Sequence, residues 1–299
     1  MLPHCFYRSP SRSGQLKRSA RTASRSPAIQ PYSTFYFFAT ALATGVITVL
    51  PLVPIRVFGR RFFLLVGLVA IVFYVLAIVG EGLGVGYFHL CAAGFLVFYE
   101  IPLRAQPGVD KQAPEKERGG GKRGIFRGAS QLFLSLAIIA AWCGIIRDSW
   151  DLPQSIQPTA AKSLSGISGA IPALSCIGSS LLIGFSLVSM TLGHWYLVSR
   201  KLPFKPLELL AGLLCLAVLF RAGAAFAAML AQGEYWSDSL AGGPTNFLLS
   251  GGLFVACRLL LGILLPGVLA LLAWRCARIG SNQSATGILY VLVAFVLFG

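Results

Sequence analysis

Long apolar runs follow one another along the chain from Thr34 onward. Most of them approach the roughly 20 residues that an α-helix needs to cross a hydrocarbon core about 30 Å thick. Short polar or charged connections separate the runs, as expected for helices that cross a bilayer repeatedly. The pattern predicts an all-α fold, a polytopic transmembrane helical bundle of about eight spans. The predicted spans are 34–55, 62–80, 83–103, 129–147, 170–198, 206–232, 247–273 and 284–298.

The composition supports a membrane location. Of the 299 residues, 56% are hydrophobic and 12% are charged, and the mean hydropathy is +0.75. These values exclude the water-soluble globular class. The seven cysteines contain no CxxC motif and fall mostly in apolar runs, where a free thiol behaves as a small hydrophobic group. We therefore expect no metal site and no disulfide framework.

The first 33 residues differ from the rest of the chain. They contain six Lys or Arg residues and seven serines without any Asp or Glu. This composition is typical of a transit peptide or of a disordered tail. We predict that 1–33 is a disordered or spurious N-terminal extension of a transmembrane helical domain that covers 34–299.

The connection 104–128 is rich in Gly, Lys and Arg. Its seven basic residues outnumber its three acidic residues, and they surround three consecutive glycines. Such a segment favours a flexible, solvated loop that contacts anionic lipid head groups. The expected partners are thus the lipid bilayer, these head groups and other membrane protein subunits, with no nucleic acid.

The basic residues of the helical body predict its orientation. Fifteen of them fall in connections on one face and two, Arg147 and Lys162, on the other. By the positive-inside rule, the loop 104–128 then lies in the cytoplasm. The six charges of 1–33 would have to cross the membrane, so either this extension is missing from the working protein or the number of early helices is different. A cleaved mitochondrial presequence would leave its end on the inside face, so we favour the bacterial cytoplasmic (inner) membrane over the mitochondrial inner membrane.

Two histidines lie within predicted spans, where an ionisable group is costly unless it is paired or hydrated. His89 lies about 9 Å from the outer end of its span, and His194 lies about one turn from the cytoplasmic end of its own. One haem cannot be ligated by this pair, although two separate sites remain open. The simpler interpretation is structural, with each ring proton bonded to a neighbouring carbonyl.

Two arginines are the strongest candidates for a ligand site. Arg221 and Arg258 are expected at the same depth, about 15 Å from the outer surface, on adjacent antiparallel helices. No Asp or Glu is predicted at that level, so an anion or a polarised quinone carbonyl would be a favourable partner. Alternatively, each guanidinium bonds backbone carbonyls near Pro or Gly, or extends toward the membrane surface.

Trp195 and Tyr196 lie where a helix leaves the cytoplasmic face, and we interpret them as anchors in the interfacial aromatic belt. The string TLGHWYLV at 191–198 and the string NQSATGILYV at 282–291 resemble a group of uncharacterised bacterial polytopic membrane proteins. The resemblance covers the body from about residue 35. It implies a bacterial inner membrane and a multi-helix bundle, and it implies nothing about a reaction.

No catalytic motif is visible, which favours a non-enzymatic protein. The first hypothesis is a membrane subunit of an electron-transfer or energy-coupling system, with Arg221 and Arg258 binding a quinone or anion and His89 as a nearby hydrogen-bond partner. Alternatives are a transporter of a small anionic solute and a structural scaffold. A quinone or haem cofactor is possible without support from a motif, and His194 marks a possible second site on the cytoplasmic side.

The orientation is testable by thiol labelling. A cysteine introduced at Gly120 should not react with a membrane-impermeant maleimide in intact cells, whereas one at Ser163 should react, because the two segments are predicted on opposite faces. The parent protein corrects for the native thiols, and permeabilised cells should label both variants. Labelling of the Gly120 variant in intact cells would contradict the predicted orientation.

Overall fold

The computed structural model describes most of the helical body and none of residues 1–33. Every regular element in the described residues is a helix, and no strand occurs among them. The predicted all-α fold is therefore confirmed. The N-terminal extension, most of the loop 104–128 and the segments 157–169 and 232–242 lie outside the described residues. The structure describes 34–81, 86–105, 120–156, 170–198, 203–231, 243 and 252–298.

The helices follow one another in the order that the apolar runs predict. Within the described residues, six stretches of 19 to 29 residues are long and apolar enough to cross a membrane, and they lie in α2 with η1, in α3, in α5, in α6, in α7, and in α10 to α11. The protein is thus a membrane protein with transmembrane helices. The elements are α2 (Thr34–Val49), η1 (Leu50–Leu52), α3 (Ile55–Glu81), α4 (Tyr87–Ala105), α5 (Gly120–Ile156), α6 (Ala170–Val198), α7 (Lys205–Ala231), α10 (Leu253–Leu259), η5 (Leu260–Leu264), α11 (Leu265–Arg278) and α12 (Asn282–Phe298).

Several helices extend beyond the predicted spans, for a common reason. The fourth span was predicted to cover 129–147, but α5 begins at Gly120 and ends at Ile156. Part of the predicted glycine-rich loop is thus helical. Hydropathy detects only the apolar part of a helix, whereas backbone hydrogen bonds continue into polar sequence. The helix α3 begins at Ile55 instead of residue 62, with a break at Gly59, whose φ of 73° suits glycine.

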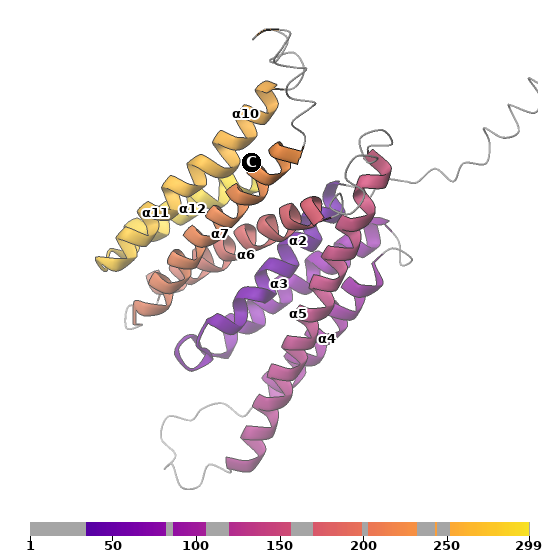
Figure 1. The fold of residues 1–299 in the computed structure, drawn as a ribbon. Coiled ribbons are helices and arrows are strands. Elements are labelled where there is room, and N and C mark those ends of the chain that lie inside the picture. Colours follow the sequence, from indigo (N-terminus) through magenta and orange to yellow (C-terminus); the bar gives the residue numbers. More distant parts are fainter. Residues whose placement is uncertain are drawn as a thin grey trace, which may run out of the picture. The chain divides into compact units, whose positions relative to one another are not determined.

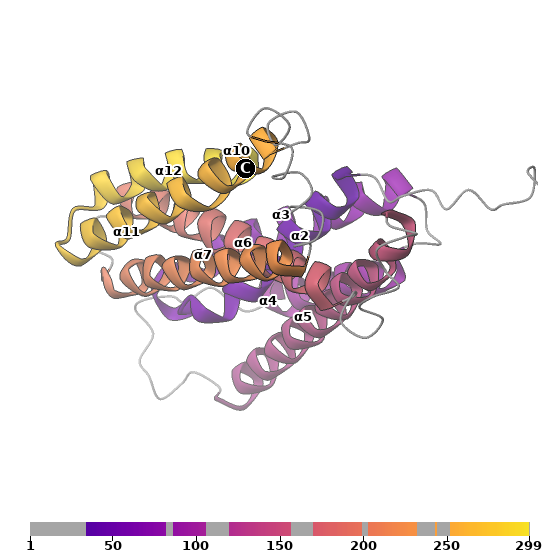
Figure 2. The same ribbon diagram turned by 45° about the horizontal axis from the view of Figure 1, so that its top comes forward.

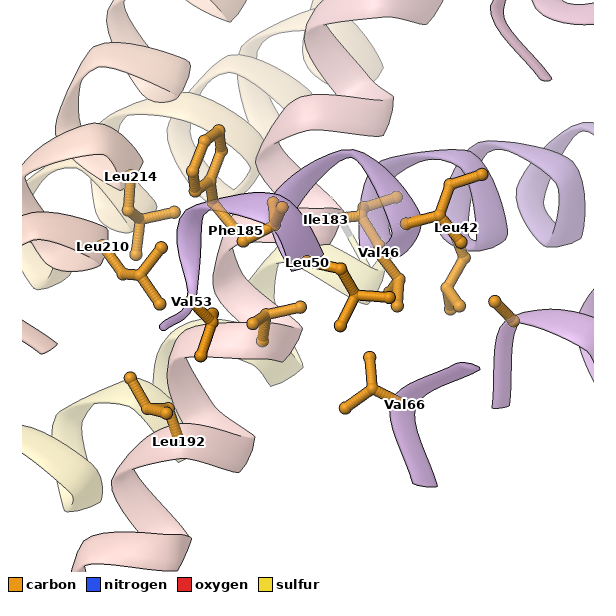
Figure 3. Packing of buried hydrophobic residues seen from close by; sticks show 14 of the residues in the cluster. Leu42, Val46, Leu50, Val53, Val66, Ile183, Phe185, Leu192, Leu210 and Leu214 are labelled. Carbon is orange, nitrogen blue, oxygen red and sulfur yellow. The ribbon is translucent and has the colours of Figure 1, made fainter. Parts of the chain in front are cut away.

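The first helix forms the centre of the packing. α2 contacts α3, α5 and α6, and most of its side chains are buried. Figure 3 shows Leu42, Val46 and Leu50 of this segment close to Ile183 of α6 and Val66 of α3. A helix that is apolar on every side is well suited to this position, because neighbouring helices cover all of its faces.

A pair of glycines brings α2 and α6 into backbone contact. A Cβ atom added at Gly45 would lie 1.9 Å from the carbonyl oxygen of Ser180, and one added at Gly184 would lie 2.2 Å from the carbonyl carbon of Gly45. No side chain larger than hydrogen fits at either position. Small residues at crossings of this kind allow helices in a membrane to approach closely, so that van der Waals contacts hold them together.

Several of the other helices pack as antiparallel pairs. α4 lies along α5, and α11 lies along α12, in both ribbon views (Figures 1 and 2). α6 also contacts α7 and α12, so it links the N-terminal helices to the C-terminal ones. Between α10 and α11 the helix contains the π turn η5 just before Pro266. Proline lacks a backbone N–H and its ring clashes with the carbonyl four residues earlier, which accounts for the local irregularity.

The glycine contact predicts a specific stability defect. Gly45→Ala should destabilise the protein by about 2–3 kcal/mol, because the new methyl group forces α2 and α6 apart. The matched control is Gly223→Ala in α7, where nothing lies within 4 Å of an added Cβ. The check is the apparent Tm of both variants in the same detergent. Equal Tm values would show that the two helices do not touch as described.

Candidate ligand-binding site

A cavity of about 510 Å³ lies among α2, α5, α6, α7, the α10–η5 segment and α12. Most of its lining residues are apolar, such as Phe37, Phe38 and Ile263. The polar and charged lining residues include Asp148, Ser175, Cys176, Ser179, Arg221 and Arg258. A few polar groups within a mostly apolar cavity are the usual composition of a small-molecule site.

The cavity lies at one end of the helices. It is lined by the first residues of α2 and α6 and by the last turns of α7, from Arg221 to Met229. The opposite ends of the helices carry most of the described basic residues, such as Arg60 at the start of α3 and Lys205 at the start of α7. The cavity is therefore remote from the face that the charge distribution predicts to be cytoplasmic.

The structure places both predicted arginines on the wall of this cavity. Arg221 lies ten residues before the end of α7, or about 15 Å along the helix. Its Nη1 donates to the carbonyl oxygen of Ser175 at 3.2 Å and to the Ser175 hydroxyl at 2.5 Å. Arg258, in the last turn of α10, lines the same cavity, and its charge acts on that of Arg221. Their binding of a ligand stays a prediction.

Gly178 allows α7 to approach α6 at the arginine. A Cβ atom added there would lie 3.2 Å from Cα of Arg221, closer than most real Cβ contacts. The absence of a side chain thus lets the guanidinium reach Ser175 on the neighbouring helix. Among the described residues, neither Arg221 nor Arg258 has a carboxylate within ion-pair distance of 4.0 Å. The arginines therefore keep the capacity to bind an external acceptor.

The expectation that no acidic residue lies at this level is wrong. Asp148 of α5 lines the cavity, with 5% of its side chain exposed. The predicted span ended at Arg147 and so assigned Asp148 to a connection. The helix actually continues for nine residues beyond Arg147, to Ile156, which places the carboxylate within the bundle.

Asp148 joins side chains from two other helices. The hydroxyl of Tyr36 in α2 donates to its Oδ2 at 2.8 Å, and Nε2 of His89 in α4 lies 3.1 Å from the same oxygen. All three side chains are buried. A buried carboxylate is stable only with such partners, since an unpaired charge would be strongly destabilising in the interior. We name Tyr36, His89 and Asp148 the acidic triad.

His89 occupies a closely fitted position. Its ring stacks on Tyr74 of α3, with 5.6 Å between the ring centroids. A Cβ atom at Gly144 would lie 2.6 Å from Cε1 of His89, so only glycine leaves room for the ring there. Its Nδ1 is buried without a hydrogen-bond partner in the described structure. His89 lies two residues after the start of α4, whereas a position about 9 Å from the helix end was predicted. Its partner is a carboxylate, whereas a backbone carbonyl was expected.

His89 does not line the cavity among the described residues, although Asp148 does. The proposed role of His89 as a hydrogen-bond partner at the arginine level therefore needs Asp148 as an intermediate. Cys176 of α6 lines the cavity together with Arg221 and Asp148, and its thiol lies beside the Ser149 hydroxyl of α5.

His194 lies far along α6 from the cavity, which involves only the first half of that helix. Its Nδ1 is 3.0 Å from the hydroxyl of Tyr290, and both side chains are exposed. A Cβ atom added at Gly193 would lie 2.8 Å from Oγ1 of Thr286. The two strings that carry the resemblance therefore pack against each other, one on α6 and the other on α12.

The interpretation of Tyr196 as an anchor in the aromatic belt does not fit its position. Its side chain is 2% exposed, and its hydroxyl donates to the carbonyl of Pro203. Its ring meets Phe58 of α3 edge to face, with centroids 5.6 Å apart. Trp195 is half-buried and contacts Phe62. Both aromatics thus serve packing between α6 and α3.

No group of three or more His, Cys, Asp or Glu residues suited to a metal ion occurs in the described part of the chain. His89 and His194 belong to separate clusters, each with an oxygen partner within about hydrogen-bond distance. No family model, curated protein or solved structure matches this chain at a significant level.

The acidic triad predicts an effect of Tyr36→Phe. Removing one donor from a buried carboxylate should cost about 1–2 kcal/mol, a range that allows for the modest hydrogen bonds measured in membrane bundles. The apparent Tm measures this loss. Tyr290→Phe is the control, because it removes an exposed hydrogen bond and should change the Tm little. An unchanged Tm for Tyr36→Phe would contradict the described bond.

Proposed function

We propose that the protein is a non-enzymatic membrane subunit that binds a quinone or an amphipathic organic anion between Arg221 and Arg258. The apolar walls of the cavity would hold the hydrophobic part of the ligand. The two guanidinium groups would hold its oxygen-rich head. Such a subunit fits within an electron-transfer or energy-coupling system of the bacterial inner membrane.

The charge of the cavity is the observation that carries the proposal. Among the described residues, two guanidinium groups line it together with one carboxylate, that of Asp148, which already accepts a bond from Tyr36 and contacts His89. An excess of positive charge remains if Asp148 is ionised. In a low-dielectric environment such an excess is stabilised by an anion or by a strongly polarised carbonyl.

The size and surface of the cavity agree with this ligand class. A volume of about 510 Å³ lies in the range of sites for drug-sized molecules. The apolar residues at its walls suit a ring or an alkyl chain, whereas a small hydrated ion gains little from them. Arg221 and Ser175 lie together on one part of the wall and would orient the polar head.

A transporter of a small anionic solute is the second candidate, and one observation favours it. The α10–η5–α11 segment is irregular beside the cavity, and Arg258, Leu259 and Gly262 of this segment line it. Interrupted helices at a substrate site are common in transporters. A transporter should carry the solute across sealed proteoliposomes, whereas a binding subunit should only retain it.

The proposed membrane rests on the distribution of Lys and Arg and on the two strings that resemble bacterial membrane proteins. In this orientation, the cavity belongs to the outer half of the bundle. The basic loop 104–128 would contact anionic lipid head groups at the cytoplasmic surface. Other subunits of the membrane system would contact the exposed apolar side chains of the described helices, for example Leu264 and Phe226.

The proposal is tested by ligand-dependent stabilisation. A short-chain ubiquinone and decanesulfonate should each be titrated against the purified full chain, and at least one should raise the Tm in a saturable way. Arg258→Leu should weaken this ligand about tenfold or more, while the Tm without ligand stays nearly constant, since Arg258 is exposed and has no ion pair in the described structure.

Arg278→Leu is the matched control, because Arg278 is exposed at the opposite end of the bundle. It should leave the binding unchanged. A response to the quinone alone would favour the electron-transfer subunit, and a response to the sulfonate alone would favour an anion site. The absence of any stabilisation by either compound would refute the proposal.

A further inference from the structure

The acidic triad is a buried polar group that the proposed ligand site does not explain. Tyr36, His89 and Asp148 come from three helices and are 0%, 1% and 5% exposed. Hydrophobic side chains of similar volume would pack at such a position without the free energy of desolvation that ionisable groups require. A function that needs an exchangeable proton would account for the choice of these residues.

We propose that Asp148 and His89 form a proton-binding site whose occupancy is coupled to the binding of an anion at Arg221 and Arg258. This inference rests on the proposed function. The anion and the proton would bind together. The net charge of the cavity would then change less than if the anion bound alone.

The geometry supplies both an acceptor and a route for the proton. A neutral His89 ring that donates its Nε2–H to Asp148 leaves a lone pair on Nδ1, and this atom is buried without a partner in the described structure. Asp148 lines the cavity, whereas His89 lies behind it. A proton that enters from the cavity can bind the Asp148 carboxylate, and in the other tautomer, with the ring hydrogen on Nδ1, it is shared between Asp148 and Nε2 of His89, so its uptake belongs to the pair as a unit.

The described tyrosine and cysteine side chains around the pair are neutral near pH 7. Tyr36 of α2 and Tyr74 of α3 contact His89 through their rings, and Cys176 of α6 senses the charge of Asp148. Tyrosine and cysteine side chains ordinarily titrate above about pH 8. Among the described residues, the charged groups near the pair are therefore the two arginines that share the cavity with Asp148, Arg147, which lies 4.6 Å from the ring centroid of Tyr87 on α4, and, when present, the bound anion.

The sign of the coupling follows from these charges. A bound anion repels the Asp148 carboxylate and so favours a proton on the pair. By reciprocity, a proton on the pair tightens the binding of the anion by the same factor. The affinity should therefore be higher at low pH and should decrease as the pH rises and the pair loses its proton.

The experiment uses decanesulfonate, because this anion does not titrate between pH 5.5 and 8.0. Its affinity for the full-length protein should be about tenfold higher at pH 5.5 than at pH 8.0, which is a usual size for coupling between sites. Calorimetry in two buffers with different ionisation enthalpies should show protons taken up as the anion binds.

Two variants test the residues. Asp148→Asn keeps an acceptor for the Tyr36 hydroxyl and removes the charge, so its affinity at pH 8.0 should rise about tenfold and lose its pH dependence. His89→Gln should reduce the pH dependence without moving either arginine. The control is Glu100→Gln, which neutralises a buried carboxylate that pairs with Arg104 at the other end of the bundle and should leave the pH dependence intact.

The outcomes separate the two proposals. Binding that needs Arg258 but has the same affinity at both pH values, or a higher affinity at pH 8.0, would overturn the proton coupling and leave the anion site in place. An affinity for decanesulfonate that still depends on pH in both Asp148→Asn and His89→Gln would also overturn it. If decanesulfonate does not bind at either pH, while ubiquinone binding through Arg258 persists, the coupled anion is refuted and the quinone site stands. Failure of both compounds refutes the proposed function itself.

Discussion

The backbone contact between α2 and α6 is the constraint on which the rest of the bundle depends. Gly45 and Gly184 leave no space for a Cβ atom, so the two helices cross at a fixed point. The cavity begins on one side of this crossing, where Thr40 and Ala41 face the region of Ser179 and Leu182. The close approach thus brings Tyr36, about two and a half turns before Gly45, to the depth at which α5 presents Asp148. A wider crossing would separate these side chains.

The sequence was sufficient to predict the class of the fold, and this success has a simple cause. A bilayer requires that backbone groups be paired within each span, so an apolar run of about 20 residues has almost no alternative to a helix. The ends of the helices were harder to predict. The apolar run ends where the sequence becomes polar, at Arg147. The helix α5 nevertheless continues through Asp148 to Ile156, because its backbone hydrogen bonds do not require apolar side chains. That difference removed Asp148 from the predicted site.

The site was predictable only in part. A common level for Arg221 and Arg258 was predicted from helix rise alone, and the structure places both at one cavity. The hydrogen-bond partner of His89 could not be predicted from the sequence, because it depends on how α4 packs against α5. The one available signal was Gly144, a glycine one turn before Asp148. Its role in leaving room for the His89 ring can be recognised only in the structure. Tyr196 shows the same limit, since its burial depends on its contact with Phe58 of α3.

The distribution of buried charge links structure to function in this bundle. Glu100 is also a buried carboxylate, but its Oε2 pairs with Arg104, which lies one turn further along the same helix and is largely exposed. Asp148 instead takes its partners from α2 and α4, while the arginines that share its cavity belong to α7 and α10. The arginines and Asp148 share a cavity without forming an ion pair. A ligand that binds between them can therefore still lower their electrostatic free energy. A bundle that needed these groups only for stability would gain more by closing the pair.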